Sequence, residues 1–132
     1  VEATDVKLGH GKVLLVEDEK ALIRLVKSML EKLGYQVHAF SSSIDALAAV
    51  KNNACEFDLV LSDVVMPDMN GPELIEKILA IKPECRVMFM SGYAADTISQ
   101  HLKMARAIPL IEKPFDLSTL SKKIRAVMDK KI

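Results

Sequence analysis

The sequence predicts a single α/β domain of the flavodoxin-like (βα)5 type, a doubly wound sandwich in which helices cover both faces of a five-stranded parallel sheet. Short apolar runs alternate five times with segments of helical periodicity, and the connections between them are short. Such alternation is typical of right-handed crossovers between parallel strands. The second apolar run is less uniformly apolar than the others, which places it at an edge and favours the strand order 2-1-3-4-5.

Each apolar run has the length of a strand that is buried on both faces. The expected strands cover residues 12–16, 35–40, 58–62, 86–90 and 108–112. The first has the wholly apolar centre Val-Leu-Leu-Val. In residues 35–40 (YQVHAF) polar side chains alternate with apolar ones, which is why this strand is expected at the edge.

The expected helices have apolar residues at helical spacing and recognisable ends. The first is stopped by Gly34 as a left-handed cap and has the apolar positions Leu22, Leu25, Val26, Met29, Leu30 and Leu33. The others are expected at residues 43–52, 72–82, 95–105 and 117–130. Ser43 is expected to cap the second helix, and Pro72 suits the first turn of the third. Either Ser118 or Asp116 could cap the fifth.

The chain is expected to contain one domain, residues 12–131, because its 132 residues and 50% hydrophobic content suit a single core. Residues 1–11 show no periodicity and end in two glycines, so we expect a linker or disordered lead-in there. A linker-like start favours an upstream domain. Both a stand-alone protein and a domain excised from a larger one remain open.

The charge balance argues against several classes of partner. Lys and Arg together number 18, as do Asp and Glu, and no basic block is visible, so direct binding to nucleic acid or to an anionic membrane is not expected. No apolar run approaches the roughly 20 residues that span a bilayer. We therefore expect a cytoplasmic protein whose partners are proteins or small ions.

Polar residues stand where the expected strands end. Because the carboxyl ends of parallel strands meet at one edge of the sheet, these side chains should converge although they are scattered along the sequence. They are Glu17 and Asp18 after the first strand, Asp63 after the third, Ser91 after the fourth and Lys113 after the fifth. Taken singly, each has an ordinary explanation as a cap, turn or surface residue. Together they indicate a site.

Three carboxylates in one place repel one another unless a cation lies among them. Oxygen ligands with room for water suit Mg²⁺, and Lys113 adds a fixed positive charge. Metal and ammonium around a carboxylate resemble a phosphoryl-transfer site. Asp63 is the best-placed nucleophile, because it stands at the centre of the sheet beside the switch point. A carboxylate acceptor gives a high-energy acyl phosphate, so its donor must be similarly energetic, as a phosphohistidine is.

The segments VLLVEDE, DLVLSDVVMPDMNG, VMFMSGY and IEKPF resemble the signature blocks of response-regulator receiver domains in two-component signalling. MSGY and IEKPF are similar to the receivers at the carboxyl end of hybrid sensor histidine kinases. The resemblance implies that Asp63 is the phosphoacceptor, Ser91 the switch hydroxyl and Lys113 the phosphate-binding lysine. It further implies that Mg²⁺ is held by Glu17, Asp18, Asp63 and the backbone carbonyl of Val65, and that the bond between Lys113 and Pro114 is cis.

The resemblance implies a regulatory domain, not an enzyme that turns over by itself, with a histidine kinase or histidine phosphotransfer domain as partner. We expect a monomer or a weak dimer. The alternative is a degenerate receiver that binds partners without phosphorylation, but such modules typically lack one of the five site residues. A dehalogenase-like phosphatase would need a second Asp where the chain has Val65. One departure concerns Leu110, which stands where many receivers have a switch Tyr or Phe.

Overall fold

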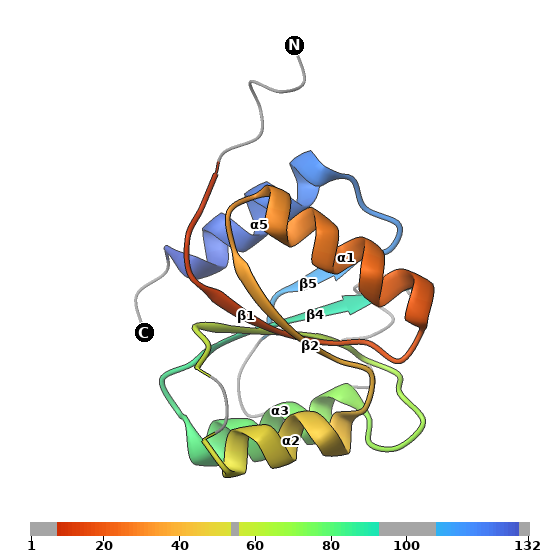
Figure 1. Cartoon of the computed structure of the whole chain (residues 1–132), viewed down its shortest axis with the longest axis vertical. Helices are drawn as coiled ribbons and strands as arrows, with labels where there is room; N and C mark the ends of the chain where they lie inside the picture. The colour runs from red at the N-terminus through yellow and green to blue at the C-terminus, as the bar shows by residue number, and fades with distance from the viewer. Residues whose placement is uncertain (1–7, 54–55, 93–107, 130–132) are drawn as a thin grey trace.

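The computed structural model describes residues 8–53, 56–92 and 108–129 (Figure 1). Within them the strands are β1 (Lys12–Val16), β2 (Gln36–Phe40), β3 (Leu59–Asp63), β4 (Arg86–Ser91) and β5 (Leu110–Glu112). The helices are α1 (Lys20–Lys32), α2 (Ser43–Lys51), α3 (Gly71–Ile81) and α5 (Leu117–Met128). The helix expected at residues 95–105 lies outside the described residues.

All five strands are parallel and form one sheet in the order β2-β1-β3-β4-β5, as the sequence predicted. β2 lies at an edge, and none of its five side chains is fully buried. β3 lies at the centre and is buried along its whole length. Because the strands run in the same direction, the polar residues at their carboxyl ends share one edge of the sheet.

Helices cover both faces of the sheet, with α1 and α5 on one side and α2 and α3 on the other (Figure 1). Successive side chains of a strand point to opposite faces. Leu14 of β1 therefore packs against α2 and α3, while Leu15 packs against α1 and α5. The two resulting cores hold the strands from both sides and so fix the positions of their carboxyl ends.

The predicted apolar stripe of α1 is correct except at Leu25. Val26 and Leu30 are buried against the sheet, whereas the Leu25 side chain is 57% exposed. Ile23, which the stripe did not include, packs against the core in a partly buried position. Gly34 follows the helix with a φ of +101°, as expected of a left-handed cap.

The predicted cap of α2 was wrong by one residue. Ser42 is the N-cap, and its hydroxyl accepts a hydrogen bond from the backbone N–H of Asp45 at 3.2 Å. Ser43 is instead the first residue of the helix and is completely buried, because its hydroxyl is used in a contact with another loop, described below. Of the two candidates for α5, Asp116 is the cap and accepts from the N–H of Thr119.

Residues 8–11, from the expected lead-in, are hydrogen-bonded to the end of α1 and to α5 before β1 begins. The backbone N–H of Gly9 donates to the carbonyl of Leu33 at 2.7 Å, and the Arg125 guanidinium donates to the carbonyl of Leu8 at 2.7 Å. Gly34 has no room for a side chain, because the Gly9 carbonyl oxygen lies against it. None of the helices that the structure describes combines the length and apolar character needed to cross a membrane.

Candidate functional site

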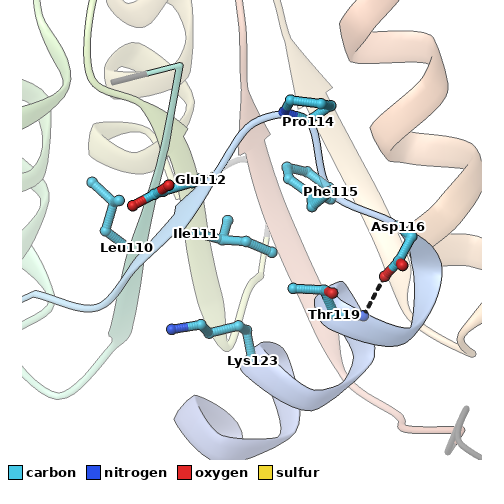
Figure 2. A pocket seen from close by; sticks show the side chains of 8 residues that line it. All are labelled: Leu110, Ile111, Glu112, Pro114, Phe115, Asp116, Thr119 and Lys123. Carbon is cyan, nitrogen blue, oxygen red and sulfur yellow. Dashed lines mark hydrogen bonds between the residues drawn. The ribbon is translucent and has the colours of Figure 1, made fainter. Parts of the chain in front are cut away.

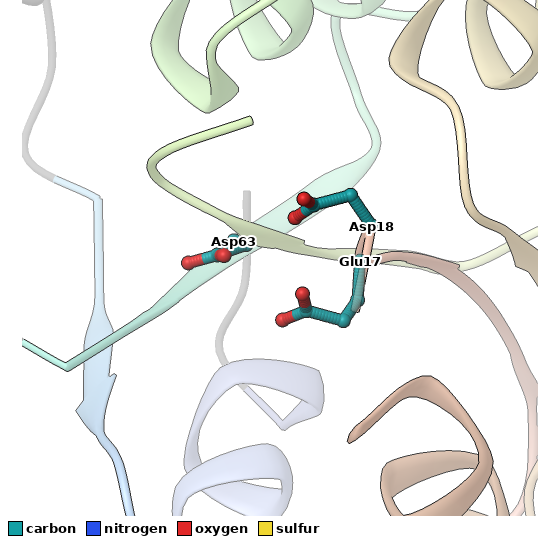
Figure 3. A group of neighbouring side chains, drawn as sticks. All are labelled: Glu17, Asp18 and Asp63. Atoms are coloured by element: carbon teal, nitrogen blue, oxygen red, sulfur yellow. The ribbon is translucent and has the colours of Figure 1, made fainter. Parts of the chain in front are cut away.

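Three carboxylates lie together at the carboxyl ends of β1 and β3, which are neighbours in the sheet. Glu17 and Asp18 directly follow β1, and Asp63 is the last residue of β3. Oxygen atoms of the three side chains lie within 4.8 Å of one another. Figure 3 shows Glu17 and Asp18 leaving the backbone in opposite directions and both carboxylates turning toward the side of Asp63. The convergence predicted from the sequence is therefore present for these three residues.

The Glu17 carboxylate is held on both oxygens. Its side chain is only 1% exposed; Oε1 accepts from the Lys113 ammonium at 3.0 Å, and Oε2 accepts from the backbone N–H of Glu19 at 2.9 Å. Burial raises the pKa of Glu17, and these two hydrogen bonds oppose that rise without cancelling it.

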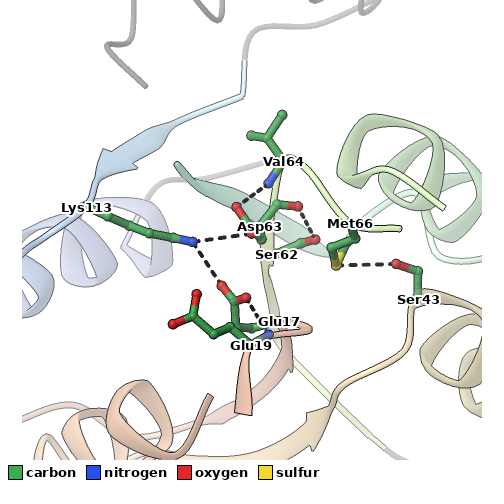
Figure 4. Close-up of polar contacts among 8 residues, drawn as sticks. All are labelled: Glu17, Glu19, Ser43, Ser62, Asp63, Val64, Met66 and Lys113. Atoms are coloured by element: carbon green, nitrogen blue, oxygen red, sulfur yellow. Dashed lines mark hydrogen bonds and ion pairs between the residues drawn. The ribbon is translucent and has the colours of Figure 1, made fainter. Parts of the chain in front are cut away.

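The Asp63 carboxylate is buried and also has contacts on both oxygens (Figure 4). Oδ1 accepts from the backbone N–H of Val64 at 2.9 Å, and Oδ2 lies 3.3 Å from Nζ of Lys113. Burial lowers the pKa of Lys113, but the hydrogen bond to Glu17 and the charge of Asp63 outweigh it and raise the pKa. Lys113 is therefore a permanent cation between two carboxylates, one directly after β1 and one at the end of β3.

One ammonium among three carboxylates leaves a net charge of about −2 when all are ionised. Like charges at this separation are unfavourable unless a cation compensates them. Carboxylate oxygens are the ligands that Mg²⁺ prefers, with its remaining positions filled by water. The donor set of Glu17, Asp18 and Asp63 fits a divalent hard cation on chemical grounds.

The other predicted site residues lie at the same edge. Ser91 ends β4, next to Met90, which pairs with Asp63. Its side chain is buried, and its backbone carbonyl accepts from the N–H of Lys113 at 2.7 Å. Val65 lies two residues beyond the end of β3, with its side chain 60% exposed. The Lys113–Pro114 bond is cis, as the resemblance implied.

Sequence reasoning missed one residue beside the site, Asp68 in the loop between β3 and α3. Its carboxylate accepts from the Ser42 hydroxyl at 2.8 Å and from the backbone N–H of Ile44 at 3.1 Å. An aspartate in a turn is common, and nothing in the sequence connects it to residues 24 and 26 positions earlier.

A separate hollow of about 360 Å³ lies beside β5 and α5, away from the three carboxylates (Figure 2). Its lining residues are Leu110, Ile111, Glu112, Pro114, Phe115, Asp116, Thr119 and Lys123. Leu110 is the residue that replaces the aromatic side chain expected from the resemblance. The hollow therefore borders the strand that carries Lys113 to the site.

Comparisons with known proteins agree with this arrangement. The family model for the response regulator receiver domain matches residues 13–125. The chain is 36% identical over 129 residues to the sensor kinase CckA of Brucella abortus, a match that covers 98% of this chain but only 14% of that kinase. It is 32% identical to the response regulator receiver protein CpdR of the same organism, where the match covers 89% of this chain and 96% of CpdR.

A solved structure similar to this chain is that of the response regulator protein TrrA from Thermotoga maritima in complex with Mg²⁺-BeF. The two share 25% sequence identity with a TM-score of 0.77. The match covers 88% of this chain and 97% of the other. The likeness therefore extends over nearly the whole of both chains.

Proposed function

Because the chain belongs to the response regulator receiver domain family, we propose that it accepts a phosphoryl group from a phosphohistidine onto Asp63. The change in shape that follows would regulate a partner or an attached domain. The observation that carries the proposal is the surroundings of Asp63. This carboxylate ends the central strand, shares the Lys113 ammonium with Glu17, and has an oxygen within 4.8 Å of oxygens of Glu17 and Asp18, which follow β1.

In the proposed step an Asp63 carboxylate oxygen attacks the phosphorus of the donor, and a new oxygen–phosphorus bond forms as the nitrogen–phosphorus bond breaks. The donor nitrogen keeps the electron pair of the broken bond, and the histidine leaves neutral after taking up one proton from solvent. Lys113 compensates the charge of the incoming phosphoryl oxygens, since its ammonium already lies 3.3 Å from Asp63. Ser91 contributes a hydroxyl from the neighbouring strand.

We assign the metal ligands to Asp18, Asp63 and the backbone carbonyl of Val65, with Glu17 completing the acidic set. Both Glu17 oxygens already accept hydrogen bonds, so Glu17 suits a ligand that acts through water. When bound, Mg²⁺ supplies positive charge opposite Lys113 and accepts phosphoryl oxygens as ligands. The TrrA structure, which is a complex with Mg²⁺-BeF, supports Mg²⁺ as the cation.

The proposed donor is a histidine kinase or a histidine phosphotransfer domain. The relatives include both a sensor kinase, of which the matching part is a small fraction, and a receiver protein of nearly the same length as this chain. The protein would act in the cytoplasm as a monomer or weak dimer, without direct contact with nucleic acid or membrane. A receiver that works without phosphorylation is not favoured, because all five expected site residues are present.

The test is phosphorylation by acetyl phosphate in the presence of Mg²⁺, followed by intact-protein mass spectrometry. The wild-type protein should gain one phosphoryl group, and Asp63→Asn should gain none. A matched control is Asp58→Asn, which removes a carboxylate just before the start of the same strand. Asp58→Asn should be labelled like the wild-type protein. Full labelling of Asp63→Asn, or full labelling of the wild type in excess EDTA, would contradict the proposal.

A further inference from the structure

The two segments that carry the acidic residues are both hydrogen-bonded to residues 40–44, which comprise the last residue of β2, the short connection and the start of α2. On one side the backbone N–H of Glu17 donates to the carbonyl of Phe40 at 3.1 Å. On the other side Ser42, Ser43 and Ile44 bind the loop between β3 and α3, residues 64–70. This connection is therefore a common support for β1 and for the loop that follows Asp63.

Asp68 anchors the β3–α3 loop with both oxygens of its carboxylate. Oδ2 accepts from the Ser42 hydroxyl and from the N–H of Ile44, while Oδ1 accepts from its neighbour's N–H, that of Met69, at 3.0 Å. These hydrogen bonds favour the charged form, so they overcome the effect of burial and lower the pKa of Asp68 to about 2. The anchor thus remains ionised at neutral pH, in the form that accepts hydrogen bonds best.

Ser43 anchors the same loop from inside the protein. Its buried hydroxyl lies 2.7 Å from the carbonyl oxygen of Met69. It also lies 3.3 Å from the sulfur of Met66, the contact drawn in Figure 4. A hydroxyl has only one proton to donate. The Met69 carbonyl oxygen is closer and is a stronger acceptor than the Met66 sulfur, so the hydroxyl donates to the carbonyl. Met66 is itself buried in the core against α2 and α3. Removing this hydroxyl leaves the Met69 carbonyl without the hydrogen bond that holds the far half of the loop.

The near end of the loop is closed as well. The backbone N–H of Gly71 donates to the carbonyl of Val64 at 2.8 Å, and Gly71 has no space for a side chain, because the Asp63 carbonyl lies against it. The two ends of the loop therefore lie next to each other, beside Asp63. Val65, whose carbonyl is the proposed metal ligand, therefore lies in a segment that is hydrogen-bonded on both sides, at Val64 and at Asp68.

We propose that Asp68 and Ser43 are positioning residues that hold the β3–α3 loop so that the Val65 carbonyl and the Asp63 carboxylate face the same cation. The inference rests on the proposed function in taking that cation to be Mg²⁺. Neither residue contacts the cation; they act through the loop. Groups that orient metal ligands in this way typically change metal affinity by about 10- to 100-fold when removed.

The test compares Mg²⁺ dissociation constants, measured by NMR titration, for the full chain and for Ser43→Ala, Asp68→Asn and Asp68→Ala. Ser43→Ala changes no charge, so a loss of affinity there cannot come from weaker electrostatic attraction. Asp68→Asn keeps one acceptor oxygen and should lose less affinity than Asp68→Ala. We expect losses of about 10-fold for Ser43→Ala and Asp68→Ala.

The control is Asp58→Asn, which also removes one negative charge and one carboxylate acceptor of a backbone N–H, that of Lys12 at 2.9 Å. Asp58 lies at the opposite end of the sheet, so its variant should bind Mg²⁺ like the wild type. Phosphorylation by acetyl phosphate supplies a second measurement. The rate of the Asp68 and Ser43 variants should recover at saturating Mg²⁺, because positioning through the metal affects occupancy of the site and leaves the acceptor intact.

The outcomes separate the two ideas. If the wild-type protein neither binds Mg²⁺ nor becomes phosphorylated, the proposed function fails. If the wild type does both and all three variants bind Mg²⁺ equally well, the positioning role is wrong and the proposed function stands. Should Ser43→Ala unfold, the comparison of Asp68→Asn with Asp68→Ala decides, since the Asp68 side chain is exposed and its loss leaves no buried cavity.

Discussion

Lys113 and Glu17 are 96 residues apart in sequence, yet their side chains meet at 3.0 Å and the Glu17 side chain is 1% exposed. The same ammonium lies 3.3 Å from Asp63. The buried Glu17 carboxylate therefore helps to fix the position of the Lys113 ammonium relative to Asp63.

Replacing Lys113 with Ala should destabilise the fold and at the same time tighten Mg²⁺ binding. The loss of one partner of a buried pair costs about 3 kcal/mol, because the buried Glu17 carboxylate is left uncompensated. In this variant Mg²⁺ no longer competes with the Lys113 ammonium for the same carboxylates. Thermal unfolding with and without Mg²⁺ measures both effects.

The matched control for Lys113→Ala is Lys12→Ala. Lys12 pairs with Glu56 at 2.9 Å at the surface, with both side chains more than a third exposed, and such pairs contribute little to stability. Lys12→Ala should leave both unfolding and Mg²⁺ affinity nearly unchanged. Weaker Mg²⁺ binding in Lys113→Ala would show that the ammonium orders the site more than it competes with the metal.

Asp18→Asn should raise the melting temperature in EDTA and weaken Mg²⁺ binding. The substitution removes one of three mutually repelling carboxylates, so it relieves unfavourable interactions in the metal-free protein. It also removes a proposed ligand. Differential scanning calorimetry in EDTA and in Mg²⁺ checks both effects. The melting temperature of Asp18→Asn should be above that of the wild type in EDTA and below it in Mg²⁺. A lower melting temperature in EDTA would contradict the repulsion argument.

We expect Ser91 and Lys113 to be the read-out of phosphorylation, each moving toward the phosphoryl oxygens and shifting a pre-existing equilibrium in the segment between β4 and the helix expected at residues 95–105. That segment lies outside the described residues. Leu110 has no aromatic ring to rotate, so changes in β5 and α5 should be small. The measurement is the change in backbone NMR shifts on addition of beryllofluoride. Shift changes in β5 and α5 as large as those after β4 would contradict this expectation.

The phosphorylated form should be comparatively long-lived, because neither Val65 nor Tyr93 carries an acid or amide that could orient a hydrolytic water. Val65 lies beside the acceptor with its side chain 60% exposed, and Tyr93 lies outside the described residues. The double variant Val65→Asn with Tyr93→Glu should hydrolyse faster. Each tenfold change corresponds to about 1.4 kcal/mol of barrier. Decay at fixed Mg²⁺ after removal of the donor is the measurement, and unchanged or slower decay would refute the idea.

Asp68 should contribute stability that depends on pH. Its pKa falls from 3.8 to about 2 on folding, so the contribution is fully present above the unfolded-state pKa and is lost as pH falls through the folded-state pKa. The side chain is exposed, so the effect is discounted to about 1 kcal/mol. Urea unfolding of wild type and Asp68→Asn should differ most near pH 6 and converge on acidification below about pH 4. A difference that grows on acidification would contradict the assignment.

Most of the fold and the acidic centre could be predicted, because both depend on repeated local patterns. Apolar runs define strands, and the parallel arrangement brings Glu17, Asp63 and Lys113 to one edge without knowledge of their contacts. The predictions that were wrong concern neighbouring residues that suit the same role equally well, where only tertiary contacts determine which one is used. Ser42 and Ser43 are both good caps, and only the position of the Met69 carbonyl decides which one turns inward.

Leu25 and Asp68 show the same limit. Leu25 fits the helical spacing, but the width of the face that the sheet covers determines which positions are buried. Asp68 is an ordinary turn residue until α2 is placed beside the loop. Long-range hydrogen bonds of this kind have no local pattern, so they come only from the assembled structure.

The distribution of the site along the chain has a consequence for synthesis and for damage. Glu17, Asp63 and Lys113 are separated by roughly fifty residues at each step, and in the described part of the chain the residues after Lys113 lead into and form α5. A ribosome-bound chain that lacks β5 has the acceptor but no ammonium beside it. On the proposed function, the site gains its lysine only when β5 is in place, so a copy truncated before β5 lacks the ammonium that would compensate the phosphoryl oxygens.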